Sequence, residues 1–318
     1  MSAPPQPAQT PRGATPPPLA PLLARGALLS PFKRPRPGAG FGAPDGGRLT
    51  LSGVRADPAH LAAYARVCGF PTDGGGDGHG SGGGGEDRGG HASPAGGDLP
   101  LPYPHVLGFP LAMSILSRRD FPLPLLGLVH TGITLTRHRP LPAGRPYELT
   151  VHVAGLAPHR RGTEAAVVTV LRADGEPVWE STSTYLARHR VPGAPAPTPD
   201  GRTERPAPLP LHAEWRLGAG LGRRYAAVSG DRNPIHLHPL TARLFGFPRP
   251  LAHGMWTAAH CLAALGTPTA TRVRIEFRSP VLLPGTVRLG SAGGEFEVRE
   301  AGEAGRVLVR GRVAGADG

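Results

Sequence analysis

Alternating apolar and charged residues mark the second half of the chain as rich in β-strands. In residues 271–278 (TRVRIEFR), Val273, Ile275 and Phe277 alternate with charged residues, which is the pattern of a strand with one buried face. The stretch before them, 254–265, is apolar on almost every side and predicts a helix buried on most sides. Gly266 is placed to end that helix. Further strands are predicted at 287–290, 295–299 and 306–313.

The first half repeats this order of elements. An apolar run at 105–117 predicts its helix, which we expect Pro110 to kink or shorten because proline removes a helical hydrogen bond. One central apolar helix wrapped by a curved antiparallel sheet fits both halves, so the predicted fold class is α+β. The strands expected in the first half are 127–137, 147–155, 164–172 and 177–186.

Three segments are too rich in proline or glycine to form a core. Residues 1–45 are proline-rich and are expected to form a disordered arm. Residues 73–99 are dominated by glycine and predict a flexible insertion, and residues 191–208 have the composition of a linker. The globular segments are therefore predicted at 46–190 and 209–315.

The two globular segments also share short matches in the same order, which predicts a duplication. Tyr64–Pro71 aligns with Tyr225–Arg232, and His105 opens the first helix where His253 opens the second. Repetition of one unit within a chain is typical of tandem domains that pack against each other.

The differences between the copies concern chemistry. Phe70 stands where the second copy has Asp231, and Val106 stands where the second copy has Gly254. We therefore expect the first copy to act as a partner surface and as a wall for an apolar substrate. The second copy is expected to carry the reactive groups.

Composition limits the range of functions. The formal charge is +12, from 35 Lys and Arg against 23 Asp and Glu, and Lys33 is the only lysine. The arginines are scattered and lack the interleaved aromatic residues of a nucleic-acid platform, so no nucleic-acid partner is expected. A basic rim would instead attract a phosphorylated carrier. The sequence has two cysteines and no secretory pattern, so we expect a cytoplasmic protein with free thiols. No apolar run approaches the ~20 residues that span a bilayer, so no membrane partner is expected.

The reactive groups lie in one turn, Ser229-Gly-Asp-Arg-Asn-Pro-Ile-His236. Asp231 and His236 are a carboxylate and an imidazole close enough in sequence to hold one water and move its protons. Ser229 and Asn233 are expected to fix the turn and orient the pair. An ordinary Gly-Asp/Asn-Pro turn explains the glycine and proline, but it does not explain an ionisable pair flanked by apolar residues.

This turn resembles the signature of the hydratase-2, or MaoC-like dehydratase, family. The resemblance implies a tandem (double) hot-dog fold whose first half is degenerate. It implies reversible hydration of trans-2-enoyl thioesters to (3R)-3-hydroxyacyl thioesters, carried by coenzyme A or an acyl carrier protein, without a metal or redox cofactor. The matching residues are Tyr225, Val228, Ser229, Gly230, Asp231, Asn233, Pro234, Ile235, His236 and Ala242.

The resemblance also implies roles for residues. Asp231 and His236 would be the catalytic dyad, with the division of acid and base roles left open. Gly254 begins a predicted helix whose first N–H groups lack partners, and the family's equivalent N–H binds the substrate carbonyl. Tyr225 is expected to support the site, and His253 is expected to be structural.

Alternatives remain open at this point. A hot-dog thioesterase or a non-catalytic acyl-binding subunit would use similar elements. No metal site is predicted, because His236 and His238 are two apart on a predicted helix and no cluster completes a tetrahedral set. His130 is expected to be a satisfied strand histidine, and the chain is expected to be a monomer with an internal pseudo-dimer or a homodimer.

Overall fold

The structure is a computed structural model that describes residues 17–30, 33, 41, 43–72, 97–191, 207–268, 271–302 and 305–315. Most of the expected glycine-rich insertion and of the expected linker lies outside these residues. The last residues of the expected insertion belong to the fold, because Asp98 forms a β-bridge with Pro142 and the side chain of Leu99 is buried.

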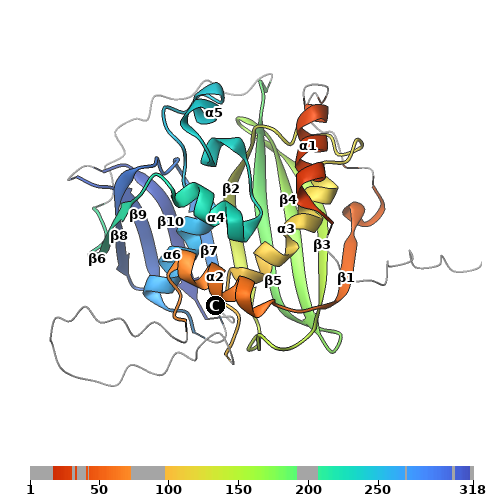
Figure 1. The fold of residues 1–318 in the computed structure, drawn as a ribbon, viewed down its shortest axis with the longest axis horizontal. Coiled ribbons are helices and arrows are strands. Elements are labelled where there is room, and N and C mark those ends of the chain that lie inside the picture. The colour runs from red at the N-terminus through yellow and green to blue at the C-terminus, as the bar shows by residue number, and fades with distance from the viewer. Residues whose placement is uncertain are drawn as a thin grey trace, which may run out of the picture.

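A single ten-stranded sheet forms the back of the molecule, with the order β1-β3-β4-β5-β2-β7-β10-β9-β8-β6 (Figure 1). The two halves meet where β2 pairs with β7 in antiparallel register, with Ile133 opposite Ile275. The strands of the first half are β1 (Leu49–Val54), β2 (Leu128–Arg137), β3 (Tyr147–His159), β4 (Gly162–Ala173) and β5 (Glu176–Arg188). Those of the second are β6 (Leu211–Leu217), β7 (Thr271–Phe277), β8 (Gly285–Ala292), β9 (Glu295–Glu300) and β10 (Val307–Ala314).

The order of strands reads the same from either edge when each strand is replaced by its counterpart in the other half. β1 corresponds to β6 at the two edges, and β2 corresponds to β7 at the centre. The predicted duplication and the α+β class are confirmed by this symmetry. The edge strands β1 and β6 were not predicted, and all eight other strands lie where the alternation placed them, within a few residues at each end.

Four helices make the matching layer on one face of the sheet (Figure 1). The central helix of the first half, α3, is Tyr103–Leu116, and that of the second, α6, is Gly254–Leu265 with Gly266 as its C-cap. The expected shortening at Pro110 does not occur, since α3 runs for 14 residues across it. The shorter helices α2 (Pro58–Cys68) and α4 (Leu221–Ser229) precede them and contact each other.

The aligned segments of the repeat end their helices in the same way. Gly69 after α2 has φ 84° and Gly230 after α4 has φ 75°, the left-handed conformation that glycine adopts without strain. Each glycine N–H bonds to the carbonyl four residues earlier, of Ala65 or Ala226. Phe70 in the first half and Asp231 in the second therefore each follow an equivalent helix cap.

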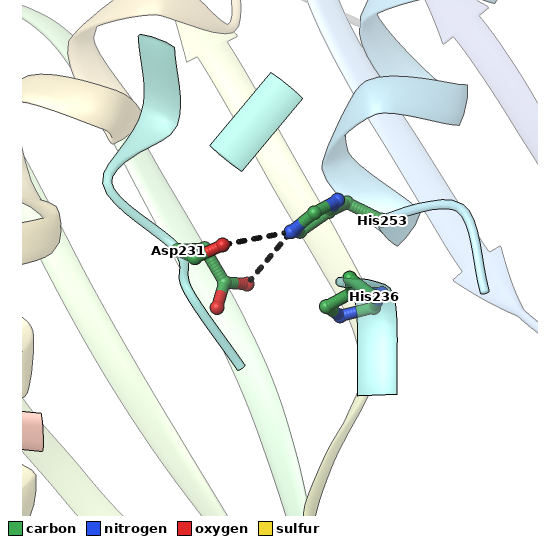
Figure 2. A group of neighbouring side chains, drawn as sticks. All are labelled: Asp231, His236 and His253. Carbon is green, nitrogen blue, oxygen red and sulfur yellow. Dashed lines mark hydrogen bonds and ion pairs between the residues drawn. The ribbon is translucent and has the colours of Figure 1, made fainter. Parts of the chain in front are cut away.

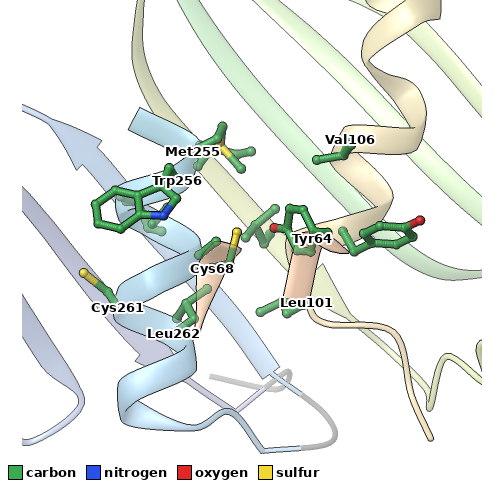
Figure 3. Close-up of a cluster of buried hydrophobic side chains, with 14 of the residues drawn as sticks. Tyr64, Cys68, Leu101, Val106, Met255, Trp256, Cys261 and Leu262 are labelled. Carbon is green, nitrogen blue, oxygen red and sulfur yellow. The ribbon is translucent and has the colours of Figure 1, made fainter. Parts of the chain in front are cut away.

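Side chains of both halves form one continuous core (Figure 3). Tyr64 of α2 and Tyr225 of α4 are buried, with ring centroids 6.4 Å apart. The indole N–H of Trp256 on α6 donates to the carbonyl of Val67 on α2 at 2.9 Å. Burial of this apolar surface is the main favourable contribution to holding the halves together.

Part of the expected disordered arm is a helix, so that expectation is wrong for these residues. Helix α1, Leu19–Leu29, packs Leu19, Leu22 and Leu23 against a second apolar cluster over α3. The hydroxyl of Ser30 donates to the carbonyl of Gly26 and accepts the N–H of Leu126. Leucines on one side of the helix supply enough apolar surface to order it, despite the prolines before it.

Both cysteines, Cys68 and Cys261, are buried and neither forms a disulfide, as expected. Burial raises the pKa of the Cys68 thiol to about 12, so it stays protonated and unreactive near neutral pH. Within the described ranges, no helix has the length and apolarity required to span a bilayer.

Leu23→Ala should lower the free energy of unfolding by about 1–2 kcal/mol, because it removes part of the apolar cover of the second cluster. Leu28→Ala, on the same helix, is the control, since the Leu28 side chain is 73% exposed. Urea unfolding of both variants measures the difference. Equal effects of the two substitutions would show that α1 does not pack as described.

Candidate active site

A chain of short-range hydrogen bonds holds Asp231 at the end of α4. The hydroxyl of Ser229 accepts the N–H of Asp231 at 3.2 Å, and Asp231 Oδ1 accepts the N–H of Asn233 at 3.1 Å. Asn233 Oδ1 in turn accepts the N–H of Ile235 at 3.4 Å and caps the short helix η3, Pro234–His236. Consecutive turns of this kind fix the backbone between Asp231 and His236.

His236 is oriented from the opposite side. Its side chain is buried, and Nδ1 lies 2.9 Å from the carbonyl oxygen of Leu251. A carbonyl only accepts, so Nδ1 carries the proton and the lone pair of the neutral ring is on Nε2. Leu251 is itself fixed, because its N–H donates to the carbonyl of Ile235 and it bridges to Leu282.

His253, at the N-terminus of α6, is the third member of the group (Figure 2). Its Nε2 donates to the main-chain carbonyl of Asp231 at 2.9 Å and lies 3.9 Å from Asp231 Oδ2. Its ring stacks on that of His236 with centroids 3.7 Å apart. The structural role expected for His253 fits the first contact, but sequence reasoning missed its place beside the carboxylate.

The three side chains converge closely enough to act on one small molecule. Their nearest nitrogen and oxygen atoms all lie within 4.8 Å of one another. A water with hydrogen bonds of about 2.8 Å on each side spans such a distance. The same three groups are the one set among the described residues that approaches a metal-ligand cluster, but His253 Nε2 is already bonded to the carbonyl of Asp231. His238 is not part of the set, since its Nδ1 caps helix α5, Pro239–Leu244.

Burial and mutual charge set the protonation states. Burial lowers the pKa of His236, and burial with the neighbouring His236 lowers that of His253 to about 4. Burial would raise the pKa of Asp231, but His253 and His236 beside it hold the pKa of this carboxyl below its ordinary value. Near neutral pH the site therefore contains an ionised carboxylate and two neutral imidazoles.

Gly254 is the first residue of α6, and the first main-chain bond of that helix runs from the Thr257 N–H to the His253 carbonyl. The N–H of Gly254 therefore lies at the positive end of the helix. The Phe277 ring covers this glycine, because a Cβ there would lie 3.0 Å from Cε1 of Phe277. The close packing of this ring favours glycine at this position.

The first half places polar side chains near Asp231. His105 is buried and His130 is partly buried, and within the described ranges His105 Nδ1 and His130 Nε2 have no hydrogen-bond partner. The prediction that His130 is satisfied is therefore wrong for one of its ring nitrogens. His130 packs against Phe277 of β7, with ring centroids 4.9 Å apart, and Tyr225 packs against His253 at 4.9 Å.

Gly222 on α4 is a positioning residue that sequence reasoning did not single out. A Cβ at this position would lie 2.0 Å from the carbonyl oxygen of His236. Helix α4 thus approaches η3 so closely that only glycine fits between them. No motif marks this glycine, since the contact joins residues that are distant in sequence.

Comparison with known proteins agrees with this fold and site. A family model described as a MaoC-like domain matches residues 205–307, which include Asp231, His236 and Gly254. The chain is 36% identical over 251 residues to the 3-hydroxyacyl-thioester dehydratase X of Mycobacterium tuberculosis, covering 78% of this chain and 80% of that protein. It is 43% identical over 51 residues to the (R)-specific enoyl-CoA hydratase of Aeromonas caviae, 16% of this chain and 38% of that one.

Solved structures extend the likeness to both halves. The crystal structure of HtdX of Mycobacterium tuberculosis superposes with a TM-score of 0.67 at 33% identity, over 84% of this chain and 99% of that one. A MaoC-like dehydratase of Phytophthora capsici has the same fold, with a TM-score of 0.62 at 20% identity, 86% of this chain and 96% of that one.

Two helix-and-sheet halves with one Asp–His site define a double hot-dog protein of the hydratase and dehydratase class. Within this class, the chain belongs to the MaoC-like dehydratase family. The predicted family, fold and type of enzyme are confirmed.

Gly222→Ala should lower kcat/KM by roughly tenfold or more, because the added methyl group would displace the His236 backbone and its imidazole. Gly218→Ala, just before α4, is the matched control, since a Cβ there meets no atom within 4 Å. Steady-state kinetics and circular dichroism of both variants test the prediction. Unchanged kinetics in a folded Gly222→Ala variant would refute the positioning role.

The free energy of unfolding should fall as the pH is lowered from about 6.5 to about 4. Burial lowers the pKa of His105 and His253 to about 4 and that of His130 to about 3. The unfolded chain therefore binds protons near pH 6.5 while the native state does not, so acid favours unfolding. Chemical denaturation at several pH values measures this loss.

His130→Phe should make that pH dependence shallower, whereas a substitution of the exposed His212 (His212→Gln) should leave it unchanged. An equally steep pH dependence in the His130→Phe variant would contradict the neutral state of His130.

Proposed function

We propose that the chain interconverts (3R)-3-hydroxyacyl thioesters and trans-2-enoyl thioesters, with Asp231 and His236 as the catalytic dyad. One arrangement carries this proposal: the Asp231 carboxylate, whose pKa is held low, and the His236 imidazole, whose Nδ1 faces the Leu251 carbonyl, bring their ligand atoms within 4.8 Å of each other. The names of the relatives, 3-hydroxyacyl-thioester dehydratase and (R)-specific enoyl-CoA hydratase, support the same reaction.

In the hydration direction the dyad would hold a water against C3 of the enoyl group. His236 Nε2 accepts one proton of that water as the C3–O bond forms, and Asp231 accepts a hydrogen bond from its other proton. The electron pair of the double bond moves toward the thioester carbonyl, and C2 then receives a proton from the dyad. Dehydration is the reverse, and the two groups exchange roles as a coupled pair.

Negative charge on the thioester oxygen needs a donor, and Gly254 is our candidate. Its N–H lies at the N-terminus of α6, where the helix dipole favours an anion. Ser229, Asn233 and Tyr225 would support the dyad without touching the reacting atoms. His253 would keep Asp231 ionised, because its Nε2–H faces that carboxylate.

Several further features belong to the proposal. No step requires a metal or a redox cofactor, and the acyl group would be carried by coenzyme A or an acyl carrier protein. We also propose a cytoplasmic location and either a monomer with an internal pseudo-dimer or a homodimer. The β2–β7 pairing of the two halves supports the pseudo-dimer within one chain.

Asp231→Asn and His236→Gln should each reduce hydration of crotonyl-CoA by roughly 10²–10⁴-fold, the usual contribution of a general acid or base. His238→Gln is the control, because His238 is close in sequence and exposed. Loss of absorbance of the enoyl thioester measures the reaction. Wild-type turnover in either dyad variant would rule out the mechanism, release of free thiol would favour a thioesterase, and binding without turnover would favour a non-catalytic subunit.

A further inference from the structure

The segment that carries the catalytic turn is strongly basic on its outer surface. Between residues 218 and 253 the only carboxylate is Asp231, which lies in the site. Five exposed arginines surround it in sequence: Arg223, Arg224, Arg232, Arg243 and Arg249.

Carboxylates of the described chain do not neutralise these arginines. Arg223 donates to the carbonyl of Leu237 and Arg249 to that of Pro284, and within the described ranges none of the five forms an ion pair. Some exposed arginines elsewhere are neutralised by carboxylates, as Arg288 is by Glu214 and Arg306 is by Glu300. The charge of this segment is therefore available to an external partner.

Helix α5 adds exposed apolar side chains to the same segment. Leu244 is 83% exposed, Leu240 62% and Phe245 40%. The other exposed large apolar residues in the described part of the chain, Leu28 and Leu211, lie on different elements. A cluster of this kind beside unpaired charges is typical of a protein-binding surface.

This surface adjoins the catalytic turn. Thr241 Oγ1 on α5 donates to the carbonyl of Pro234 at 2.7 Å, so α5 is anchored to the helix that carries His236. Helices α5 and α4 both contact η3, and Figure 1 draws them on the same face of the sheet. The Asp231 side chain is 31% exposed while those of His236 and His253 are buried, which places the open side of the site at Asp231.

We propose that α5 and the five arginines form a docking surface for an acidic acyl carrier protein that delivers the thioester to Asp231. We call these residues the α5 surface. The inference rests on the proposed function and decides between its two carriers. The phosphates of coenzyme A would pair with one or two arginines, but they would not cover Leu240, Leu244 and Phe245. An acidic protein provides both carboxylates for the arginines and apolar contacts for the leucines.

The test compares one crotonyl group on three carriers: pantetheine, coenzyme A and a purified acyl carrier protein of acidic net charge. Pantetheine has neither the nucleotide phosphates nor a protein surface, so it reports on the catalytic site alone. Coenzyme A adds the nucleotide phosphates, and the carrier protein adds its surface. We expect the lowest KM with the carrier protein, and we expect that KM to rise with salt because exposed charges are screened.

Two variants of the α5 surface separate its components. Arg243→Glu reverses a charge and Leu244→Ser removes the most exposed apolar side chain. Each should raise KM for the carrier-protein substrate by roughly tenfold, with kcat and both small-carrier reactions unchanged. Matched controls are Arg188→Glu and Leu211→Ser, exposed positions on β5 and β6.

An equal rise in KM for coenzyme A and the carrier protein would overturn the proposal and make the surface a nucleotide site. An unchanged KM for all three carriers would also overturn it. Calorimetric titration of Asp231→Asn with the crotonyl carrier protein tests docking without turnover. Binding that is lost in the Arg243→Glu background would support the α5 surface even if the reaction itself were different, whereas absence of binding would refute it.

Discussion

The pairing of β2 with β7 is the interaction on which the rest of the molecule depends. It joins two half-sheets into one and fixes their helices side by side, so that Tyr64 and Tyr225 share a core. It also brings His130 of β2 against Phe277 of β7, the ring that covers Gly254. Without this ladder each half would expose the apolar face that the other now covers.

The protonation states of Asp231, His236 and His253 follow from burial and from their proximity to one another. The carbonyl of Leu251 selects one tautomer of His236, and the carbonyl of Asp231 selects one tautomer of His253. Two main-chain acceptors thus orient two imidazoles without adding any charge. Because the two imidazoles are buried, the side of the carboxylate that faces them lies in a less polar medium than bulk water, and its interactions with them are stronger.

Much of this arrangement was predictable from the sequence. Periodicity located both central helices and eight strands. The alignment of Tyr64–Pro71 with Tyr225–Arg232 paired the two segments in which the structure shows matching caps, without predicting the caps themselves. The failures share a cause, because each depends on contacts between distant residues. The prolines before α1 suggested disorder, but an apolar surface elsewhere in the fold orders it. Similarly, only the packing of α4 on η3 reveals the constraint on Gly222. Only the packing around His130 leaves its Nε2 without a hydrogen-bond partner in the described part of the chain.

The matched helix caps at Gly69 and Gly230 allow the stability of the two halves to be compared with and without a carboxylate. In both halves a helix ends at a glycine in the left-handed conformation. The next residue is Phe70 in the first half, whose ring stacks on Tyr64, and Asp231 in the second. The architecture thus accepts an apolar residue at this point, and folding does not require the charge. In its second half the chain keeps a carboxylate whose burial is unfavourable. Its first half has the same helix cap without that carboxylate, and therefore without the unfavourable free energy of burying it.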